Sequence, residues 1–342
     1  MNVFGTVLTN AGPSANYRGE SEQNRSVIQR VTQGRFEYAV ISPEAMRNAL
    51  REILQGYKLP CNRERLHDEE QLAVKFDDYP FPERYADDFF FGYMVAGGRD
   101  ERARIHEAVK HRNIPFAFKR DSVLRMNLAK ALEPYRHDAL FTQSPLTVAA
   151  SPWRNSTTSA LLHRETTVTA YQYPFAINLN DCRLDDGLPP LDGIRSPEGA
   201  PYGTRAQQYA DWLRYLLRGI SELNGVAGNH ARSYFEMAPA SIILRVTNSL
   251  VAGYDLYAFR PDGSTPEVID GILQNDYPGG EFCIGGRIVR EVLSDDARTK
   301  LEEKGATLCR LAAGALNRVA EKATGTGFLE STQGEVNAAA SR

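Results

Sequence analysis

The sequence predicts an α+β fold, because strand-like and helix-like segments follow one another in mixed order around one large charged insertion. Residues 3–9 are typical of a strand. Residues 35–41 alternate apolar residues with polar or small neighbours, which is the period of a half-buried strand. The segment between them, residues 10–24, is crowded with polar residues and glycine, so we expect a long polar loop there.

A helix is expected from Pro43 to about Gln55, since Ser42 can cap its free N–H groups and a proline is tolerated in the first turn. Arg47 and Arg51 are four residues apart on a polar face and are both expected at the surface. The apolar stripe of this helix consists of Met46, Ala49, Leu50, Ile53 and Leu54.

The distribution of apolar residues in the rest of the sequence predicts further strands and helices. Strands are expected at residues 146–150, 166–179, 241–246 and 254–259, and helices at residues 204–223 and 294–323. The turn-rich segment 151–159 is expected to project from the fold. Residues 324–342 have little to bury and are expected to form a tail.

Composition is that of an ordinary globular chain. It has 342 residues, 42% of them apolar, and a formal net charge of −3, which disfavours a surface that coats nucleic acid everywhere but permits one local basic groove. Neither a membrane span nor a secretory signal is recognisable, so we expect a cytoplasmic location. The cysteines are far apart and are expected to be buried thiols, with no zinc cluster or disulfide framework: Cys61, Cys182, Cys283 and Cys309.

Catalytic signatures are absent from the sequence. No phosphate-binding loop, dinucleotide fingerprint or nucleophile elbow occurs. His106 and His111 would lie about 140° apart on a helix, too far around it to share a metal. The acids Asp87 and Asp88 flank an expected aromatic strand, and we interpret them as structural. We therefore expect no catalytic residues, no metal and no cofactor.

Several strings of the sequence resemble the DevR-type, type I-B-like branch of the seventh Cas family, the backbone subunit of the type I CRISPR effector Cascade. The polar loop ending in Asn16-Tyr17-Arg18-Gly19-Glu20-Ser21-Glu22-Gln23-Asn24 is similar to an N-N-R-G-E-x-E-x-N motif of that branch. The other similar strings, in family order, are residues 40–51, 88–94, 169–176 and 226–232.

The resemblance implies a modified RRM-like, ferredoxin-like palm with helical fingers and a projecting thumb. In this sequence a single domain would cover residues 1–323, with fingers at about residues 58–141 and a thumb at about residues 150–164. The implied partners are a crRNA guide, target DNA in the heteroduplex, neighbouring copies of the chain and other Cascade subunits, with no membrane. The complex would serve either CRISPR defence or RNA-guided transposition.

The resemblance implies a subunit that binds the phosphate backbone of the guide and leaves the guide bases free to pair. Candidate RNA-binding residues in the polar loop and the first helix are Asn16, Arg18, Asn24, Arg25, Ser42, Arg47 and Arg51. Trp153 could insert between bases, as thumbs of this family do, or could be a core tryptophan. A glycine-containing loop adds Gly228, Asn229, His230 and Arg232, with a tight structural turn as the alternative.

Two other functions compete with this interpretation. Type III backbone subunits have a similar fold and cut target RNA with a metal and an aspartate of the early loop, but this loop has Glu20 and Glu22 and no Asp. A sequence-specific regulator of single-stranded RNA would need the two short RRM signatures, which are not recognisable.

Overall fold

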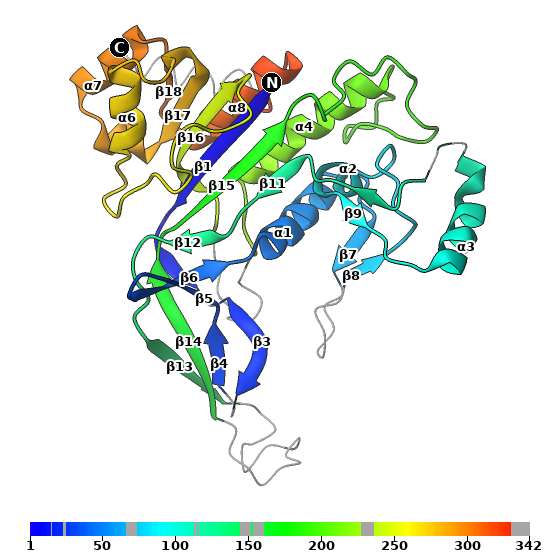
Figure 1. Ribbon diagram of the computed structural model, residues 1–342, viewed down its shortest axis with the longest axis horizontal. Coiled ribbons are helices and arrows are strands. Elements are labelled where there is room, and N and C mark those ends of the chain that lie inside the picture. Colours follow the sequence, from blue (N-terminus) through cyan, green and yellow to red (C-terminus); the bar gives the residue numbers. More distant parts are fainter. Residues whose placement is uncertain are drawn as a thin grey trace.

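The computed structural model confirms the α+β class and has one large central sheet with helices on both faces (Figure 1). It describes residues 1–14, 16–22, 25–65, 74–112, 114, 116–143, 152, 161–226 and 236–329.

The central sheet has nine strands in the spatial order β18-β17-β16-β1-β15-β12-β6-β5, with β11 also paired to β15. They are β1 (Asn2–Thr9), β5 (Arg30–Gln33), β6 (Phe36–Ile41), β11 (Leu124–Met126), β12 (Ala129–Ala131), β15 (Tyr171–Asn178), β16 (Pro239–Thr247), β17 (Phe282–Gly286) and β18 (Thr307–Cys309). Neighbours are antiparallel except β17 and β18. The expected strands near residues 3–9, 35–41 and 241–246 are confirmed as β1, β6 and β16.

Alternate residues of β1 supply two different cores, because successive side chains of a strand point to opposite faces of the sheet. Val3 and Val7 join the larger core, and Phe4 and Leu8 join a second core on the other face. Burial of the central strands on both faces explains why their sequences are almost continuously apolar rather than alternating.

Three helices pack on the larger core: α1 (Pro43–Gly56), α4 (Arg205–Ser221) and α8 (Ala312–Thr324). The two helices expected at residues 43–55 and 204–223 are confirmed as α1 and α4. Thr204 caps α4 in a capping box with Gln207. The second core lies under α6 (Pro266–Leu273), α7 (Asp295–Glu303) and the π-helix η4 (Ile288–Val292). The short helix η3 (Gly279–Glu281) directly precedes β17.

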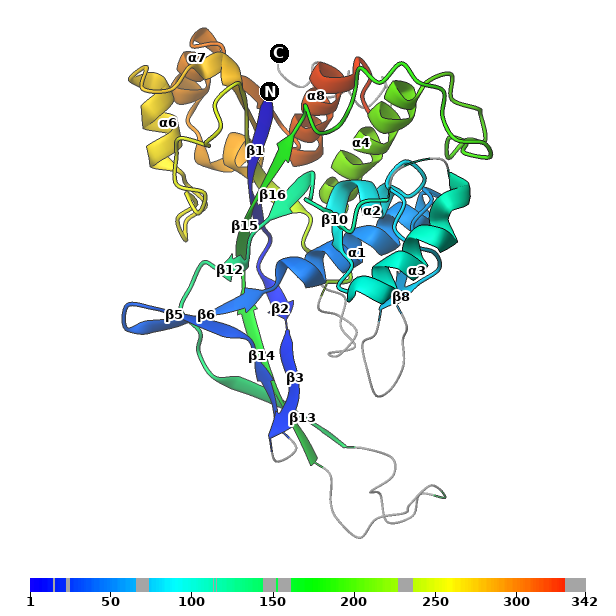
Figure 2. The ribbon, with the colours of Figure 1, turned by 45° about the vertical axis from the view of Figure 1, so that its right-hand side comes forward.

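A slender β-arm extends from the edge of the molecule (Figures 1 and 2). It contains β2 (Gly12–Ser14), β3 (Tyr17–Glu22), β4 (Arg25–Ile28), β13 (Asp138–Gln143) and β14 (Leu161–Thr169). Strands β2 and β3 lie within residues 10–24, where we expected a loop, so that expectation is wrong. The strand expected at residues 166–179 is divided at Ala170 between β14 in the arm and β15 in the central sheet.

The insertion between α1 and β11 is only partly helical. It consists of β7 (Arg63–Arg65), β8 (Val74–Phe76), α2 (Ala86–Phe91), β9 (Tyr93–Met94), α3 (Arg99–Val109), η1 (Lys110–Arg112) and β10 (Lys119–Arg120). The expected aromatic strand at Phe89 is the short helix α2. Strands β11 and β12 lie within the sequence range expected for the fingers, yet they pair with the central sheet.

Two expectations for the C-terminal third are wrong. The segment expected as a helix at residues 294–323 is two helices separated by β18, because Gly305 has a φ of 89° and β18 pairs with β17. The strand expected at residues 254–259 is irregular. The Gln172 side chain of β15 bonds both the backbone N–H and the carbonyl of Phe259, so a side chain replaces strand pairing there.

The start of the expected tail is packed, because Asn317 Oδ1 accepts hydrogen bonds from the backbone N–H groups of Phe328 and Leu329. The rest of the tail, residues 330–342, and the strand expected at residues 146–150 lie outside the described residues. All four cysteines are free thiols, but the expectation that all four are buried is wrong for two of them. Cys182 and Cys283 are buried, whereas Cys61 and Cys309 are partly exposed.

Candidate nucleic-acid interface

The start of α1 is held beside the arm by hydrogen bonds from residues of the predicted site. Ser42 Oγ accepts from the N–H of Ala45, which confirms Ser42 as the N-cap, and Pro43 begins the helix. Asn16 Nδ2 donates to the carbonyl of Val40, the penultimate residue of β6. The structure therefore brings Asn16 and Ser42 together at the junction of β6, α1 and the arm.

Arg47 lies one turn into α1 and is partly accessible, with 22% of its side chain exposed. In the described part of the chain, its one ion pair is with Glu44, at 2.6 Å, and the Glu44 side chain is 69% exposed. An exposed partner of this kind holds an arginine weakly, so a phosphate can replace it at little cost.

Arg51 is buried, and our expectation of two surface arginines is wrong. Asp87 and Phe91 of helix α2 contact Arg51, whose side chain is 8% exposed, against 22% for Arg47. The Arg51 guanidinium lies 3.2 Å from Asp87, donates to Asn48 and sits over the ring of Phe91. Burial, together with the nearby charge of Arg63, lowers its pKa to about 10.

The acids of α2 form the centre of this buried cluster, which confirms their structural role. Asp87 accepts from the backbone N–H groups of Asn62 and Arg63 at 2.7 and 3.1 Å. Asp88 accepts from the Asn62 side chain and from the N–H of Phe81 at 2.8 and 2.9 Å. The cluster joins α1, α2 and the first loop of the insertion, because an unpaired buried carboxylate or peptide group would be costly.

The pKa of Asp88 is raised above its ordinary value of 3.8 by burial and by the neighbouring charge of Asp87. Because the folded protein holds this proton more tightly than the unfolded chain, protonation of Asp88 favours the fold. This contribution to the free energy of unfolding is complete below pH 3.8 and is lost as the pH rises through the folded-state pKa. Asp88→Asn should remove this loss, so its unfolding free energy should vary less with pH than that of the wild type. Urea unfolding from about pH 4 to 7 measures the difference, and identical pH profiles would contradict the prediction.

The other predicted RNA-binding residues lie wholly or partly outside the described part of the chain. The backbones of Arg18 and Arg25 lie in β3 and β4, and Arg25 is opposite Glu22. Their side chains fall outside the described part of the chain, as do Asn24, Trp153, Gly228, Asn229, His230 and Arg232 in full.

One group that the sequence did not reveal lies on the same edge of the central sheet as β6. Lys130 Nζ is 5.5 Å from the ring centroid of Tyr38 and 4.9 Å from that of Tyr257, and it donates to Gln33. Strand β12 supplies Lys130, and Tyr257 belongs to a turn more than a hundred residues further on, so no local pattern could predict the contact.

The arm carries a second group that the sequence did not reveal. Phe141 of β13 is 69% exposed, and its ring is stacked on that of His163 of β14, at 5.0 Å between centroids and 8° between planes. An exposed stacked pair offers a flat face of the kind on which unpaired bases stack.

Within the described ranges, no group of three or more His, Cys, Asp or Glu residues is arranged to hold a metal ion. His106 and His111 lie on α3 and η1, and His106 contacts the ring of Phe118. None of the helices found in the described part of the chain has the length and apolarity needed to cross a membrane.

These features define the chain as an α+β protein with a central sheet, a β-arm and a candidate nucleic-acid surface at their junction. Over 314 residues it is 27% identical to the "CRISPR-associated protein Cas7/Cst2/DevR" of Myxococcus xanthus (strain DK1622), covering 86% of this chain and 91% of that protein. This relative confirms the resemblance to DevR-type proteins that the sequence motifs predicted. No family model matches the chain.

Two solved structures share the fold. One is a chain of a "CRISPR RNA-guided surveillance complex", with a TM-score of 0.54 and 13% identity over 94% of this chain and 100% of that one. The other is a chain of a "CRISPR RNA-guided surveillance complex, pre-nicking", with a TM-score of 0.57 and 11% identity over the same shares.

Proposed function

We propose that this chain is a non-catalytic, RNA-binding backbone subunit of a type I CRISPR Cascade complex. Several copies would line one crRNA guide and support its pairing with target DNA. The observation that carries the proposal is the relationship to the Cas7/Cst2/DevR protein, which extends over 86% of the chain. The likeness to chains of RNA-guided surveillance complexes supports the same architecture.

The junction of the arm and α1 has the chemistry that such a subunit needs. The positive end of the α1 dipole and the accessible guanidinium of Arg47 can bind phosphates without reading bases. Lys130 and the stacked pair Phe141 and His163 extend this surface along the sheet edge and the arm. We propose that the guide follows this path past α1, β12 and the arm.

The remaining sequence-predicted contacts belong to this proposal. In it, Arg18, Asn24 and Arg25 approach the guide from the arm, and Trp153 in the proposed thumb inserts between bases. Gly228, Asn229, His230 and Arg232 complete the backbone contacts. The central sheet with α1 and α4 corresponds to the RRM-like palm, and the segment between α1 and β11 to the fingers.

Reconstitution with a guide tests the proposal directly. Copurified with crRNA, the protein should form a particle that contains several copies per guide, and ribonuclease should leave protected RNA of uniform length. Native mass spectrometry gives the copy number. One copy per guide, or no retained RNA, would refute the backbone role.

The same particle tests the absence of catalysis. Residues 16–24 supply Glu20 and Glu22 but no Asp, so complementary RNA incubated with Mg²⁺ should stay intact. Cleavage that disappears in Glu20→Ala or Glu22→Ala would instead identify a metal-dependent nuclease.

A further inference from the structure

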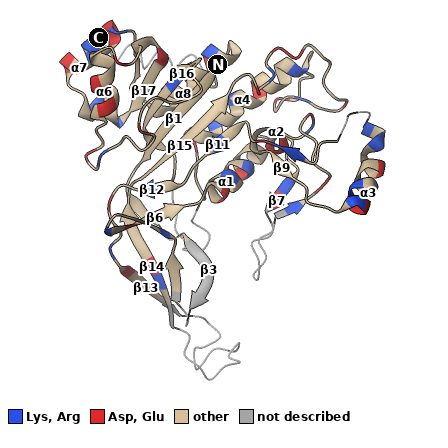
Figure 3. Ribbon diagram, in the orientation of Figure 1, with Lys and Arg blue, Asp and Glu red and all other residues tan. Residues whose placement is uncertain are grey.

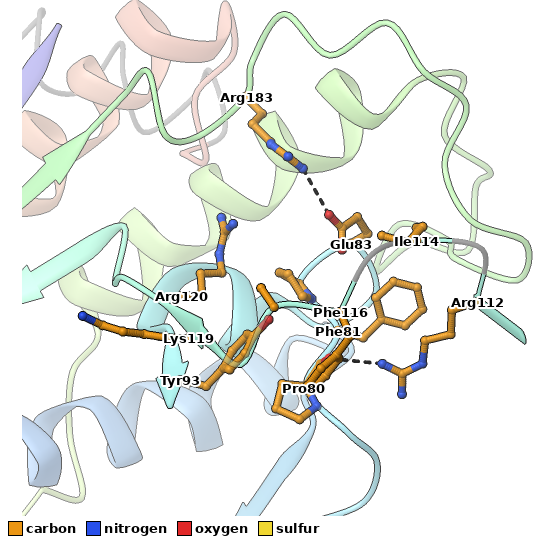
Figure 4. A pocket seen from close by; sticks show the side chains of 12 residues that line it. Pro80, Phe81, Glu83, Tyr93, Arg112, Ile114, Phe116, Lys119, Arg120 and Arg183 are labelled. Atoms are coloured by element: carbon orange, nitrogen blue, oxygen red, sulfur yellow. Dashed lines mark hydrogen bonds and ion pairs between the residues drawn. The ribbon is translucent and has the colours of Figure 1, made fainter. Parts of the chain in front are cut away.

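The insertion contains a cavity of about 340 Å³ that the proposed guide path does not use (Figure 4). It lies between the segment 80–83, strands β9 and β10, and the turn at residue 183, away from the arm. This volume is within the range of pockets that bind small organic ligands, about 300 to 1,000 Å³.

The walls of the cavity are strongly cationic. Among the described residues, the cavity is lined by four cations, Arg112, Lys119, Arg120 and Arg183, and by one acid, Glu83. The neighbouring helix α3 carries both basic and acidic residues, so this charge balance is a property of the lining itself (Figure 3). A cavity with this charge balance favours an anionic ligand.

The four basic side chains differ in their hydrogen bonds and ion pairs. Arg112 donates to Asp78 and to the carbonyls of Tyr79 and Pro80, and Arg183 is paired with Glu83 at 3.2 Å. Lys119 is highly exposed and lies 3.5 Å from Asp121. Arg120 differs from all three, because its Nε is buried and has no hydrogen-bond partner among the described residues. Figure 4 draws no interaction from its guanidinium to another lining residue.

Other contacts hold Arg120 in place. Its guanidinium lies over the ring of buried Phe89, 5.0 Å from the centroid, so the side chain is oriented by a flat apolar surface. Tyr93 lies close by. Burial raises the pKa of the Tyr93 hydroxyl to about 12, and the positive charge of Arg120 partly opposes that rise. Arg120 as a whole is half-buried and lines the cavity, so a phosphate in the cavity can pair with its charge, although not through the buried Nε.

Aromatic side chains give the cavity an apolar wall in addition to its positive charge. Phe116 is half-buried and its ring meets that of Phe118 edge-on, at 5.0 Å, while Phe81 forms a floor under Arg112. Rings and guanidinium planes are the groups on which nucleobases stack. An inorganic anion alone would use the cations but leave this apolar wall in contact with water.

We propose that this cavity binds a nucleoside monophosphate unit, with its phosphate on Arg120 and its base against the aromatic wall. The unit has two possible sources with the same chemistry, a free nucleotide or one unpaired nucleotide of a strand. The site is separate from the guide surface, so it does not rest on the proposed function.

Calorimetric titration of the full-length chain tests the site with adenosine 5′-monophosphate, adenosine, inorganic phosphate and a short single-stranded oligoadenylate. The monophosphate should bind more tightly than either of its parts. Arg120→Gln should weaken this binding at least about tenfold, since a charge-assisted hydrogen bond is lost. Arg120→Lys, which keeps the charge, should retain part of the affinity.

A second variant separates ligand binding from folding. Ala117 lines the cavity and is exposed, so Ala117→Trp should block the site without disturbing the core. Ala103→Trp is the matched control, because Ala103 is exposed on α3 and does not line the cavity. Thermal melts of all variants should agree within a few degrees.

The outcomes decide both the site and its source. Binding of the monophosphate that Arg120→Gln and Ala117→Trp both weaken identifies a free nucleotide. The same sensitivity with the oligoadenylate alone identifies a nucleotide within a strand. Absence of binding of either probe at millimolar concentration, binding that both variants retain, or phosphate bound as tightly as the monophosphate would overturn the proposal. Because the titration uses the free chain, it remains informative if guide assembly fails.

Discussion

Asp87→Ala is expected to lower the free energy of unfolding by about 3–5 kcal/mol, the usual cost of removing one partner from a buried ion pair. The substitution leaves the Arg51 guanidinium buried without its carboxylate and deprives the N–H groups of Asn62 and Arg63 of their acceptor. Urea denaturation measures the loss. Asp192→Ala is the control, because Asp192 is exposed and should change stability by no more than about 0.5 kcal/mol.

A double-mutant cycle shows whether Arg51 is responsible for that loss. Arg51→Met should cost less than Asp87→Ala, since Asp87 keeps its two backbone donors and its contact with Arg63. The coupling between the two substitutions should exceed about 1 kcal/mol, as it does for residues in one ionic network. Additive effects would mean that the cluster depends on the backbone hydrogen bonds alone.

Arg47→Ala should reduce the salt dependence of guide binding in every subunit. One phosphate contact with single-stranded RNA contributes about 0.7 to the slope of log affinity against log salt concentration. A particle with n copies on one guide should therefore lose about 0.7n from its slope, so a small change in each copy has a large effect on assembly. Salt titration of guide binding by the reconstituted particle is the measurement, and guide sequence should not matter.

Arg318→Ala provides a matched control for Arg47. Arg318 of α8 pairs with Glu321 at 2.9 Å three residues away, much as Arg47 pairs with Glu44, and it lies on a different helix. Both substitutions should leave the melting temperature nearly unchanged, because each pair has one exposed partner, Glu44 in one and Arg318 in the other, and such pairs contribute little. Equal salt slopes for wild type and Arg47→Ala would contradict the proposed contact.

Local sequence patterns predicted the elements whose signals are complete within a short segment. Ser42 and Pro43 give the start of α1, and the periodic apolar residues of α4 give its length. The alternation before Ile41 predicts β6. The early motif, together with the strings that follow it, identified the resemblance that the Myxococcus xanthus protein confirms.

Contacts between distant segments decided the rest. Arg47 and Arg51 share a helix face by spacing, yet only Arg51 is buried and paired with Asp87 of α2, whereas Arg47 is partly accessible. Gly305 and the pairing of β18 with β17 divide a helix that looks continuous in sequence. The cavity around Arg120 requires residues 80–83, 112–120 and 183 to meet in space. The sequence by itself therefore determined the α+β fold class, the resemblance carried by the early motif and the well-capped helices. The burial and ion pairing of charged side chains depended on which surfaces the tertiary structure brings together, because those contacts join segments far apart in the chain.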